Sequence, residues 1–231
     1  MSAQMSVLYD QTANVIRRIY DSRIVAPAVL DPASHFPDAR RFVAEWQRLR
    51  QEALHIAAQL HRVPRFHEIM SEQAAISAND QRDWRMFILK AYGVEVPENI
   101  ESCPVLSALV ASSPDVLSAS ISFLAPWKHI PAHRGPFRGV LRFYLVLAMP
   151  LAPDGEPAAV LRIGDTEYRL ADGEALLWDD TYEHEVWNRS DEVRIVLLLD
   201  IRRHDMPLDM RLLSRGLVLL VRLAIGLRGF G

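Results

Sequence analysis

The chain has 231 residues, of which 50% are hydrophobic and 24% are charged. These values are typical of a folded globular protein and exclude a disordered chain. The net charge of −3 gives no electrostatic reason to expect a nucleic-acid partner. The only cysteine, Cys103, excludes an internal disulfide framework and a cysteine-based zinc site. The first residues lack the pattern of a secretory signal, so we expect a cytoplasmic location.

Residues 1–117 are predicted to form a mainly helical part that packs on the rest of the chain. After Pro37, apolar residues recur at three- and four-residue spacing as far as Leu60, which indicates one face of a helix, and Pro64 ends it. The stretch 83–93 is short and aromatic-rich and is a candidate strand. Residues 105–111 are expected to form a short helix.

From residue 118 to 203 the pattern changes to the period of β-strands. After a first strand near residues 118–123, strands are predicted at 141–149, 159–163, 166–170, 174–178, 182–187 and 193–201. Gly164 and Asp165 mark a hairpin turn between two of them. About seven short strands at this spacing favour an antiparallel sandwich or barrel, and no helical period separates them as a βαβ fold would require.

The last part, residues 204–231, is predicted to be an apolar and basic helix that begins at about Leu208. Its longest uncharged piece, 216–221, is far shorter than the ~20 apolar residues that a membrane-spanning helix needs. Arg211, Arg215 and Arg222 would form one narrow stripe on this helix. Two interpretations stay open. Residues 206–231 could contact a membrane surface peripherally, on its inner face, or they could dock on the domain itself or on a second subunit.

Two histidines at the ends of predicted strands are the candidate metal ligands. The chain has no GxGxxG, P-loop or GxSxG motif, and the HExxH pattern that begins at His184 fails at Asn188. His133 precedes the long strand, and His184 lies in the segment DDTYEHEVW. Two histidines from separate strands, together with a carboxylate, are the ligands of non-haem iron(II) in a facial triad. Spacing alone also allows two ordinary structural histidines.

The segments HRGPFRGVLRFYLVLAMP (133–150) and LLWDDTYEHEVWNRSDEVRIVLLLDIRR (176–203) resemble the aspartyl/asparaginyl β-hydroxylase family. The resemblance covers roughly residues 36–203. It implies an iron(II)- and 2-oxoglutarate-dependent oxygenase with a double-stranded β-helix, the jelly-roll or cupin-like fold. The expected architecture is therefore mainly β with flanking helices. The family also includes bacterial lipid A acyl-chain 2-hydroxylases.

The resemblance also implies roles for individual residues. His133 and His184 match the two iron ligands. Arg194, ten positions after the second histidine, matches the arginine that anchors a 2-oxoglutarate carboxylate, and Arg142, nine after the first, matches the other anionic contact. Guanidinium groups suit this task because they bind carboxylates bidentately. With 24 arginines in the chain, either arginine alone could equally be a solvated strand residue.

Three more positions match or nearly match the cosubstrate site of the family. Ser122 stands eleven residues before the first histidine, and Trp84 matches a tryptophan of the preceding segment. Tyr144 stands where animal members have a histidine, and it shares one strand face with Arg142. Its hydroxyl could replace the hydrogen bond of that histidine, or the side chain could be a core aromatic.

Gly135 departs from the complete triad. It occupies the position of the triad carboxylate, two residues after His133, and cannot ligate a metal. Animal members also have glycine there, with water completing the iron sphere, whereas the lipid hydroxylases have an aspartate. Asp180 is then expected to accept a hydrogen bond from that water, with a plain turn residue as the alternative.

The expected function is a dioxygenase that hydroxylates an unactivated carbon while 2-oxoglutarate is converted to succinate and carbon dioxide. The substrate would be an aspartyl- or asparaginyl-type amino acid or peptide, or the acyl chain of a lipid. The alternative is a non-catalytic β-helix protein that binds a metal or a small acid as a sensor or scaffold. Succinate formation that depends on iron and 2-oxoglutarate separates the two.

Overall fold

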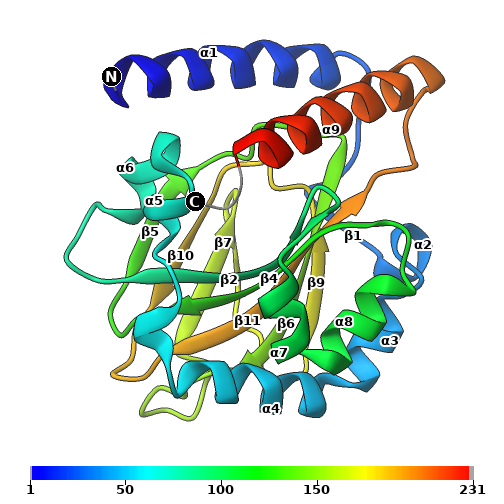
Figure 1. Cartoon of the computed structure of the whole chain (residues 1–231). Helices are drawn as coiled ribbons and strands as arrows, with labels where there is room; N and C mark the ends of the chain where they lie inside the picture. The colour runs from blue at the N-terminus through cyan, green and yellow to red at the C-terminus, as the bar shows by residue number, and fades with distance from the viewer. Residues whose placement is uncertain (1, 229–231) are drawn as a thin grey trace.

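The computed structural model describes residues 2–228, with side chains from residue 11 onward. Two antiparallel sheets face each other (Figure 1). The larger sheet has the strand order β1 (Val29–Leu30), β9 (Ala175–Trp178), β6 (Val140–Ala148), β11 (Arg194–Arg202), β4 (Val116–Leu124), β2 (Trp84–Ala91) and β3 (Val94–Glu95). The smaller sheet has the order β5 (His129–His133), β10 (His184–Asn188), β7 (Ala159–Ile163) and β8 (Thr166–Tyr168).

The path of the chain through these sheets is that of a double-stranded β-helix. From β4 to β11 the chain passes back and forth, with β4, β6, β9 and β11 in the larger sheet and β5, β7, β8 and β10 in the smaller one. All these strand pairs are antiparallel. The predicted fold class, a jelly-roll core with flanking helices, is confirmed.

The first 117 residues supply both helices and strands. The helices are α1 (Ser2–Asp21), α2 (Pro32–His35), α3 (Ala39–Ala44), α4 (Trp46–Ala57), α5 (Phe66–Ile69), α6 (Ala74–Ser77), α7 (Pro97–Ser102) and α8 (Pro104–Ala111), with 3₁₀ turns at Leu60–Arg62 and Ser71–Gln73. The helix expected after Pro37 is two helices, because Glu45 leaves the helical conformation and its N–H bonds to Phe42 O. Strands β1, β2 and β3 join the larger sheet, so this part is not purely helical.

The period of two along the strands separates two apolar layers. One face of β6, which carries Phe143, points away from the smaller sheet and packs against the helices α2, α3, α4 and α8. Phe143 contacts Phe36 and Phe42 in this layer. The inward layer lies between the two sheets and contains Trp84, Trp178 and further apolar side chains of both sheets. Charged side chains on the same inward faces, such as Arg142 and Arg194, therefore lie between the two sheets.

Helix α9 (Leu208–Arg228) lies beside α1, at the end of the sheets opposite α4 (Figure 1). Met206 and Met210 pack with Tyr20 of α1. The Tyr20 hydroxyl lies 2.7 Å from Ser214 Oγ. One face of the tail is thus docked on the chain's own domain, and leucines of its other face are exposed. No helix in the described part is long and apolar enough to cross a membrane. Residues 229–231 of the predicted tail lie outside the described residues.

Candidate metal and cosubstrate site

His133 and His184 lie directly opposite each other on two neighbouring strands of the smaller sheet. His133 ends β5 and His184 begins β10, and the antiparallel register pairs them. Their ring centroids are 4.1 Å apart, with an angle of 55° between the ring planes. The two histidines that are 51 positions apart in the sequence are therefore brought side by side, as two ligands of one metal ion would have to be.

Each of these imidazoles is oriented by a backbone carbonyl two residues earlier. His133 Nδ1 lies 2.7 Å from Pro131 O, and His184 Nδ1 lies 2.9 Å from Tyr182 O. Because a carbonyl only accepts, Nδ1 carries the proton in both rings, and Nε2 keeps its lone pair. Histidines that bind metals are held by a hydrogen bond of the other ring nitrogen in this way.

Burial favours the neutral form of both rings. It lowers the pKa of His133, and it lowers the pKa of His184 well below its ordinary value, with the neighbouring His133 adding to the effect. Metal binding requires the neutral imidazole. Among the described residues no group of three or more His, Cys, Asp or Glu could hold a metal ion. His133 and His184 therefore stay predicted ligands.

Asp180 occupies the space where a side chain of residue 135 would lie. A Cβ built on Gly135 would be 2.1 Å from Asp180 Oδ1, and the Gly135 N–H donates to Asp180 O at 2.7 Å. The loop after His133 therefore fits against Asp180 only because residue 135 is a glycine. Asp180 Oδ1 is buried and has no hydrogen-bond partner in the described structure. Burial raises the pKa of Asp180 to about 6.

Arg142 is paired with carboxylates of the protein itself. Its Nη2 lies 3.1 Å from Asp180 Oδ2 and 2.9 Å from Asp200 Oδ1. The two acidic neighbours raise the pKa of Arg142 although burial opposes them. Arg142 therefore holds the carboxylates of Asp180 and Asp200, and its expected contact with the cosubstrate stays a prediction.

Arg194, unlike Arg142, has no carboxylate partner among the described residues. It is 2% exposed, and its Nε is buried without a hydrogen-bond partner. Its guanidinium lies over the ring of Tyr144, with 5.7 Å from Cζ to the ring centroid. Burial lowers the pKa of Arg194. A buried cation without a counter-charge is costly, so this position is suited to an anion that comes from outside the chain.

Ser122 and Trp84 are joined by a hydrogen bond in the same inter-sheet layer. Trp84 Nε1 donates to Ser122 Oγ at 3.0 Å, and the indole stacks on Phe66 with 3.9 Å between ring centroids. Since its single polar atom is used, Trp84 positions Ser122. The hydroxyl proton of Ser122 remains available for an acceptor.

Trp178 lies in this site although no sequence motif singles it out. It is buried, its ring lies edge-on to that of His184 with 4.4 Å between centroids, and its Nε1 has no hydrogen-bond partner in the described structure. It comes from the larger sheet and pairs in register with Arg142. It therefore connects the arginine side of the site with the histidine side. Its position two residues before Asp180 was the available signal.

A buried ion-pair network holds the turn that carries Asp180. Asp179 is fully buried and accepts from Arg138 Nε and Arg203 Nη1, each at 2.7 Å. Its other oxygen accepts from the backbone N–H and the hydroxyl of Thr181. Arg138 also pairs with Asp21 at the end of α1. The turn 179–181 is thereby fixed between the two sheets.

The chain is similar in sequence to known hydroxylases. A family model described as aspartyl/asparaginyl beta-hydroxylase matches residues 43–204. An ornithine lipid ester-linked acyl 2-hydroxylase of Rhizobium tropici is 35% identical over 174 residues, which are 75% of this chain and 60% of that protein. The human aspartyl/asparaginyl beta-hydroxylase is 24% identical over 127 residues, which are 53% of this chain and 16% of that protein. The chain thus spans less than two thirds of either relative.

Among solved structures, the cupin domain of Schizosaccharomyces pombe Cnp3 matches 39% of this chain and 58% of that chain, with 9% identity and a TM-score of 0.31.

Proposed function

The chain belongs to the aspartyl/asparaginyl β-hydroxylase family, and on that premise we propose that it is an iron(II)- and 2-oxoglutarate-dependent dioxygenase that hydroxylates an unactivated carbon. The observation that carries the proposal is Arg194, a buried cation without a carboxylate partner in the layer between the sheets. A dicarboxylate cosubstrate would supply the missing counter-charge. When bound, iron(II) and 2-oxoglutarate together would activate dioxygen, with succinate and carbon dioxide as by-products.

His133 and His184 would hold the iron. Both present an unprotonated Nε2, because their Nδ1 protons are bound to Pro131 O and Tyr182 O. Imidazole nitrogen is a suitable ligand for iron. Two protein ligands leave more positions open for cosubstrate, water and oxygen than a three-ligand site does.

Arg194 would bind one carboxylate of 2-oxoglutarate, and Ser122 would donate a hydrogen bond to it. The Ser122 hydroxyl is held by the Trp84 indole, so its proton can point to the ligand. Tyr144 lies against the Arg194 guanidinium and closes this side of the site. A charge-assisted bond in a desolvated site is stronger than one at the surface.

Asp180 would accept a hydrogen bond from the water that completes the metal site. Its Oδ1 has no partner among the described residues, and its Oδ2 is fixed by Arg142. A carboxyl whose pKa is about 6 can hold or release a proton near neutral pH. We therefore assign Asp180 to holding that water through its free Oδ1.

Of the two substrate classes, a lipid acyl chain has the better support. The similarity to the lipid hydroxylase is higher and covers more of this chain than the similarity to the peptidyl hydroxylase. Gly135 is the feature that favours the peptidyl class. However, Asp180 already places a carboxylate where a residue-135 side chain would lie, so the glycine does not remove a carboxylate from this region.

The test is turnover of 2-oxoglutarate by the purified protein, with iron(II), air and a bacterial lipid extract. We expect succinate and a lipid product heavier by one oxygen atom. His133→Ala and His184→Ala should abolish both products, whereas Arg189→Met, which removes an exposed arginine outside the site, should not. A protein that binds metal and 2-oxoglutarate but forms no succinate would instead be the non-catalytic sensor or scaffold.

A further inference from the structure

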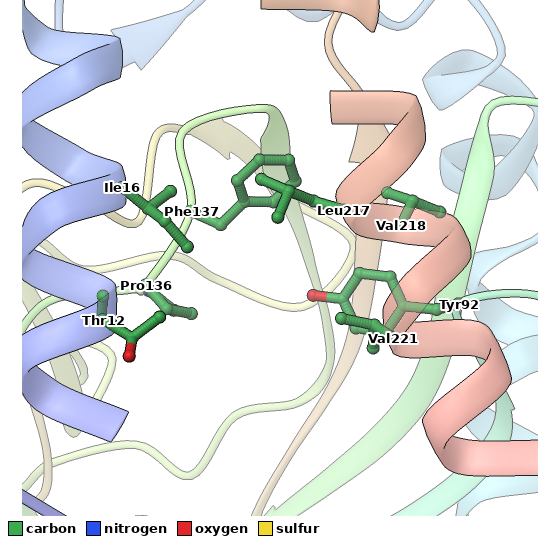
Figure 2. Close-up of a pocket in the computed structure, with 9 residues that line it drawn as sticks. Thr12, Ile16, Tyr92, Pro136, Phe137, Leu217, Val218 and Val221 are labelled. Carbon is green, nitrogen blue, oxygen red and sulfur yellow. The ribbon is translucent and has the colours of Figure 1, made fainter. Parts of the chain in front are cut away.

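Helices α1 and α9 border a half-open apolar pocket outside the metal site. Its volume is about 180 Å³. Figure 2 shows Ile16 of α1 and Leu217 and Val218 of α9 directed toward this space, with Phe137 between the helices. The lining side chains present almost no polar surface. An engineered cavity of about 150 Å³ lined by such side chains stays dry and binds small hydrocarbons, so a hydrocarbon suits this pocket better than water does.

The pocket adjoins the loop that carries the first metal ligand. Pro136, which also lines it, directly follows Gly135. The backbone N–H of Gly135 donates to Asp180 O at 2.7 Å, and its carbonyl accepts from Arg17 Nη1 of α1 at 2.9 Å. Arg17 follows the pocket residue Ile16. The adjacent residues Gly135 and Pro136 thus connect the two places: Gly135 bonds to Asp180, and Pro136 lines the apolar pocket.

The outer face of α9 beside the pocket is strongly apolar and exposed. Leu212, Leu219, Leu220, Leu223 and Leu227 are between 55% and 88% exposed. Exposed apolar surface of this kind indicates a binding surface. Arg211, Arg215 and Arg222 of the same helix are exposed as well. Apolar residues with arginines on one helix are typical of a helix that lies in the interface of an anionic membrane.

We propose that the pocket between α1 and α9 receives the acyl chain of a membrane lipid while the outer face of α9 rests on the membrane. This inference rests on the proposed function and extends it, because it names the lipid and the route of its chain. The headgroup end of the lipid would lie at the metal site, and the hydrocarbon would pass Pro136 and Phe137 into the pocket. The almost wholly apolar space fits a hydrocarbon chain, and the arginines fit the anionic headgroups around it.

The experiment uses photocrosslinking from vesicles of phosphatidylethanolamine and phosphatidylglycerol that contain a phospholipid with a diazirine near the end of one acyl chain. After irradiation, labelled residues are located by peptide mass spectrometry. We expect labels on Ile16 of α1 and on Leu217 or Val218 of α9. Labels only on the outer leucines of α9, labels elsewhere, or no labels would overturn the proposal.

Two variants and a control sharpen the result. Val218→Trp fills the pocket from α9, and Thr12→Phe fills it from α1, so that one informative variant remains if the other does not fold. Either should abolish labelling of Ile16 in a protein whose melting curve is unchanged. Leu54→Trp, on the exposed face of α4, should leave the labelling intact. Persistent labelling of Ile16 in a folded filled variant would contradict the proposal.

The outcome is independent of the proposed chemistry. Crosslinking needs neither iron nor 2-oxoglutarate, so pocket labelling without succinate formation would retain the lipid site and remove the dioxygenase. Iron-dependent succinate formation without pocket labelling would retain the dioxygenase and remove the lipid site.

Discussion

At the scale of single residues, two buried arginines of this chain have different electrostatic partners. Arg203 and Arg194 are both almost completely buried, at 1% and 2% exposed. Arg203 pairs with Asp179 and Asp205. Arg194 lies over the ring of Tyr144 and forms no ion pair with a described residue. Breaking a buried ion pair is destabilising, while replacing an uncompensated buried charge by an apolar group is not.

The first prediction therefore gives the two arginines opposite effects on stability. Arg203→Met should lower the free energy of unfolding by about 3–5 kcal/mol, because it leaves buried carboxylate charge behind. Arg194→Met should leave the stability of the ligand-free protein unchanged or raise it by roughly 1–2 kcal/mol. Urea unfolding at pH 7.5 measures both. If Arg194→Met lowers the free energy of unfolding as much as Arg203→Met does, Arg194 has a structural role instead.

The second prediction follows from the buried Asp180. Its pKa of about 6 in the folded chain lies above the value of about 3.9 for an unperturbed aspartate. The folded state therefore binds this proton more tightly, and the stability from this group falls as the pH rises from about 4 to 6. Metal-free Asp180→Asn should melt at a higher temperature than the wild type at pH 7.5, with no such difference at pH 4.

The matched control is Asp165→Asn in the exposed β7–β8 turn, which should change the melting temperature little, as an exposed substitution does. An Asp180→Asn variant that is less stable than the wild type at pH 7.5 would mean that the ion pair with Arg142 outweighs burial.

The third prediction concerns the contact between Gly135 and Asp180. Because a Cβ at residue 135 would meet Asp180 Oδ1 at 2.1 Å, Gly135→Ala should displace that carboxylate. The effects of Gly135→Ala and Asp180→Ala on turnover should then be strongly non-additive, as for groups in direct contact. In the Asp180→Ala background, Gly135→Asp should bind iron more tightly than Gly135→Ala does. Equal metal affinities in titrations would place residue 135 away from the metal.

At the scale of elements, the sequence predicts the strands well because each has the period of two and a turn signal. Seven of the eight strands from β4 to β11 were expected, at similar bounds. The missing one, β5, contains Pro131 and ends in His133. Its single buried apolar residue, Ile130, gives no apolar alternation to detect. The break at Glu45 was missed because the apolar spacing runs through α3 and α4 without interruption.

The contacts of α1 could not be predicted from local sequence patterns. Arg17 bonds to the backbone of Gly135, which is 118 positions away, and no local pattern reports such a distance. The tail was expected to be helical from about Leu208, and α9 begins there. The sequence does not predict what α9 packs against, because leucines occur on nearly all sides of the helix.

The fourth prediction tests which face of α9 is docked. Met210 is buried against Tyr20, whereas Leu212 is 57% exposed. Met210→Ala should cost about 2–4 kcal/mol of stability, because it removes a buried side chain and leaves a cavity. Leu212→Ala should change stability by less than about 0.5 kcal/mol, as an exposed position does. Chemical denaturation gives both values, and similar costs at the two positions would contradict the docking of α9.

At the scale of the whole molecule, the site lies between two sheets whose facing surfaces supply different groups. The smaller sheet contributes the two histidines, and the larger sheet contributes Arg142, Arg194, Ser122 and Trp178. The family motifs located the histidines and the arginines, because strand register fixes those positions. They did not reveal that Asp200 shares Arg142 with Asp180, or that Trp178 touches His184, because such contacts depend on side-chain packing.

Arg194 is proposed to anchor a carboxylate of 2-oxoglutarate beside a two-histidine metal site. The most direct test is calorimetric titration of 2-oxoglutarate into the protein loaded with manganese(II), without oxygen. Arg194→Met should weaken binding by on the order of 2–4 kcal/mol, the cost of losing a desolvated charge-assisted pair. Arg194→Lys should recover part of the lost binding free energy. Arg189→Met should bind 2-oxoglutarate as the wild type does. An unchanged affinity in Arg194→Met would contradict the account.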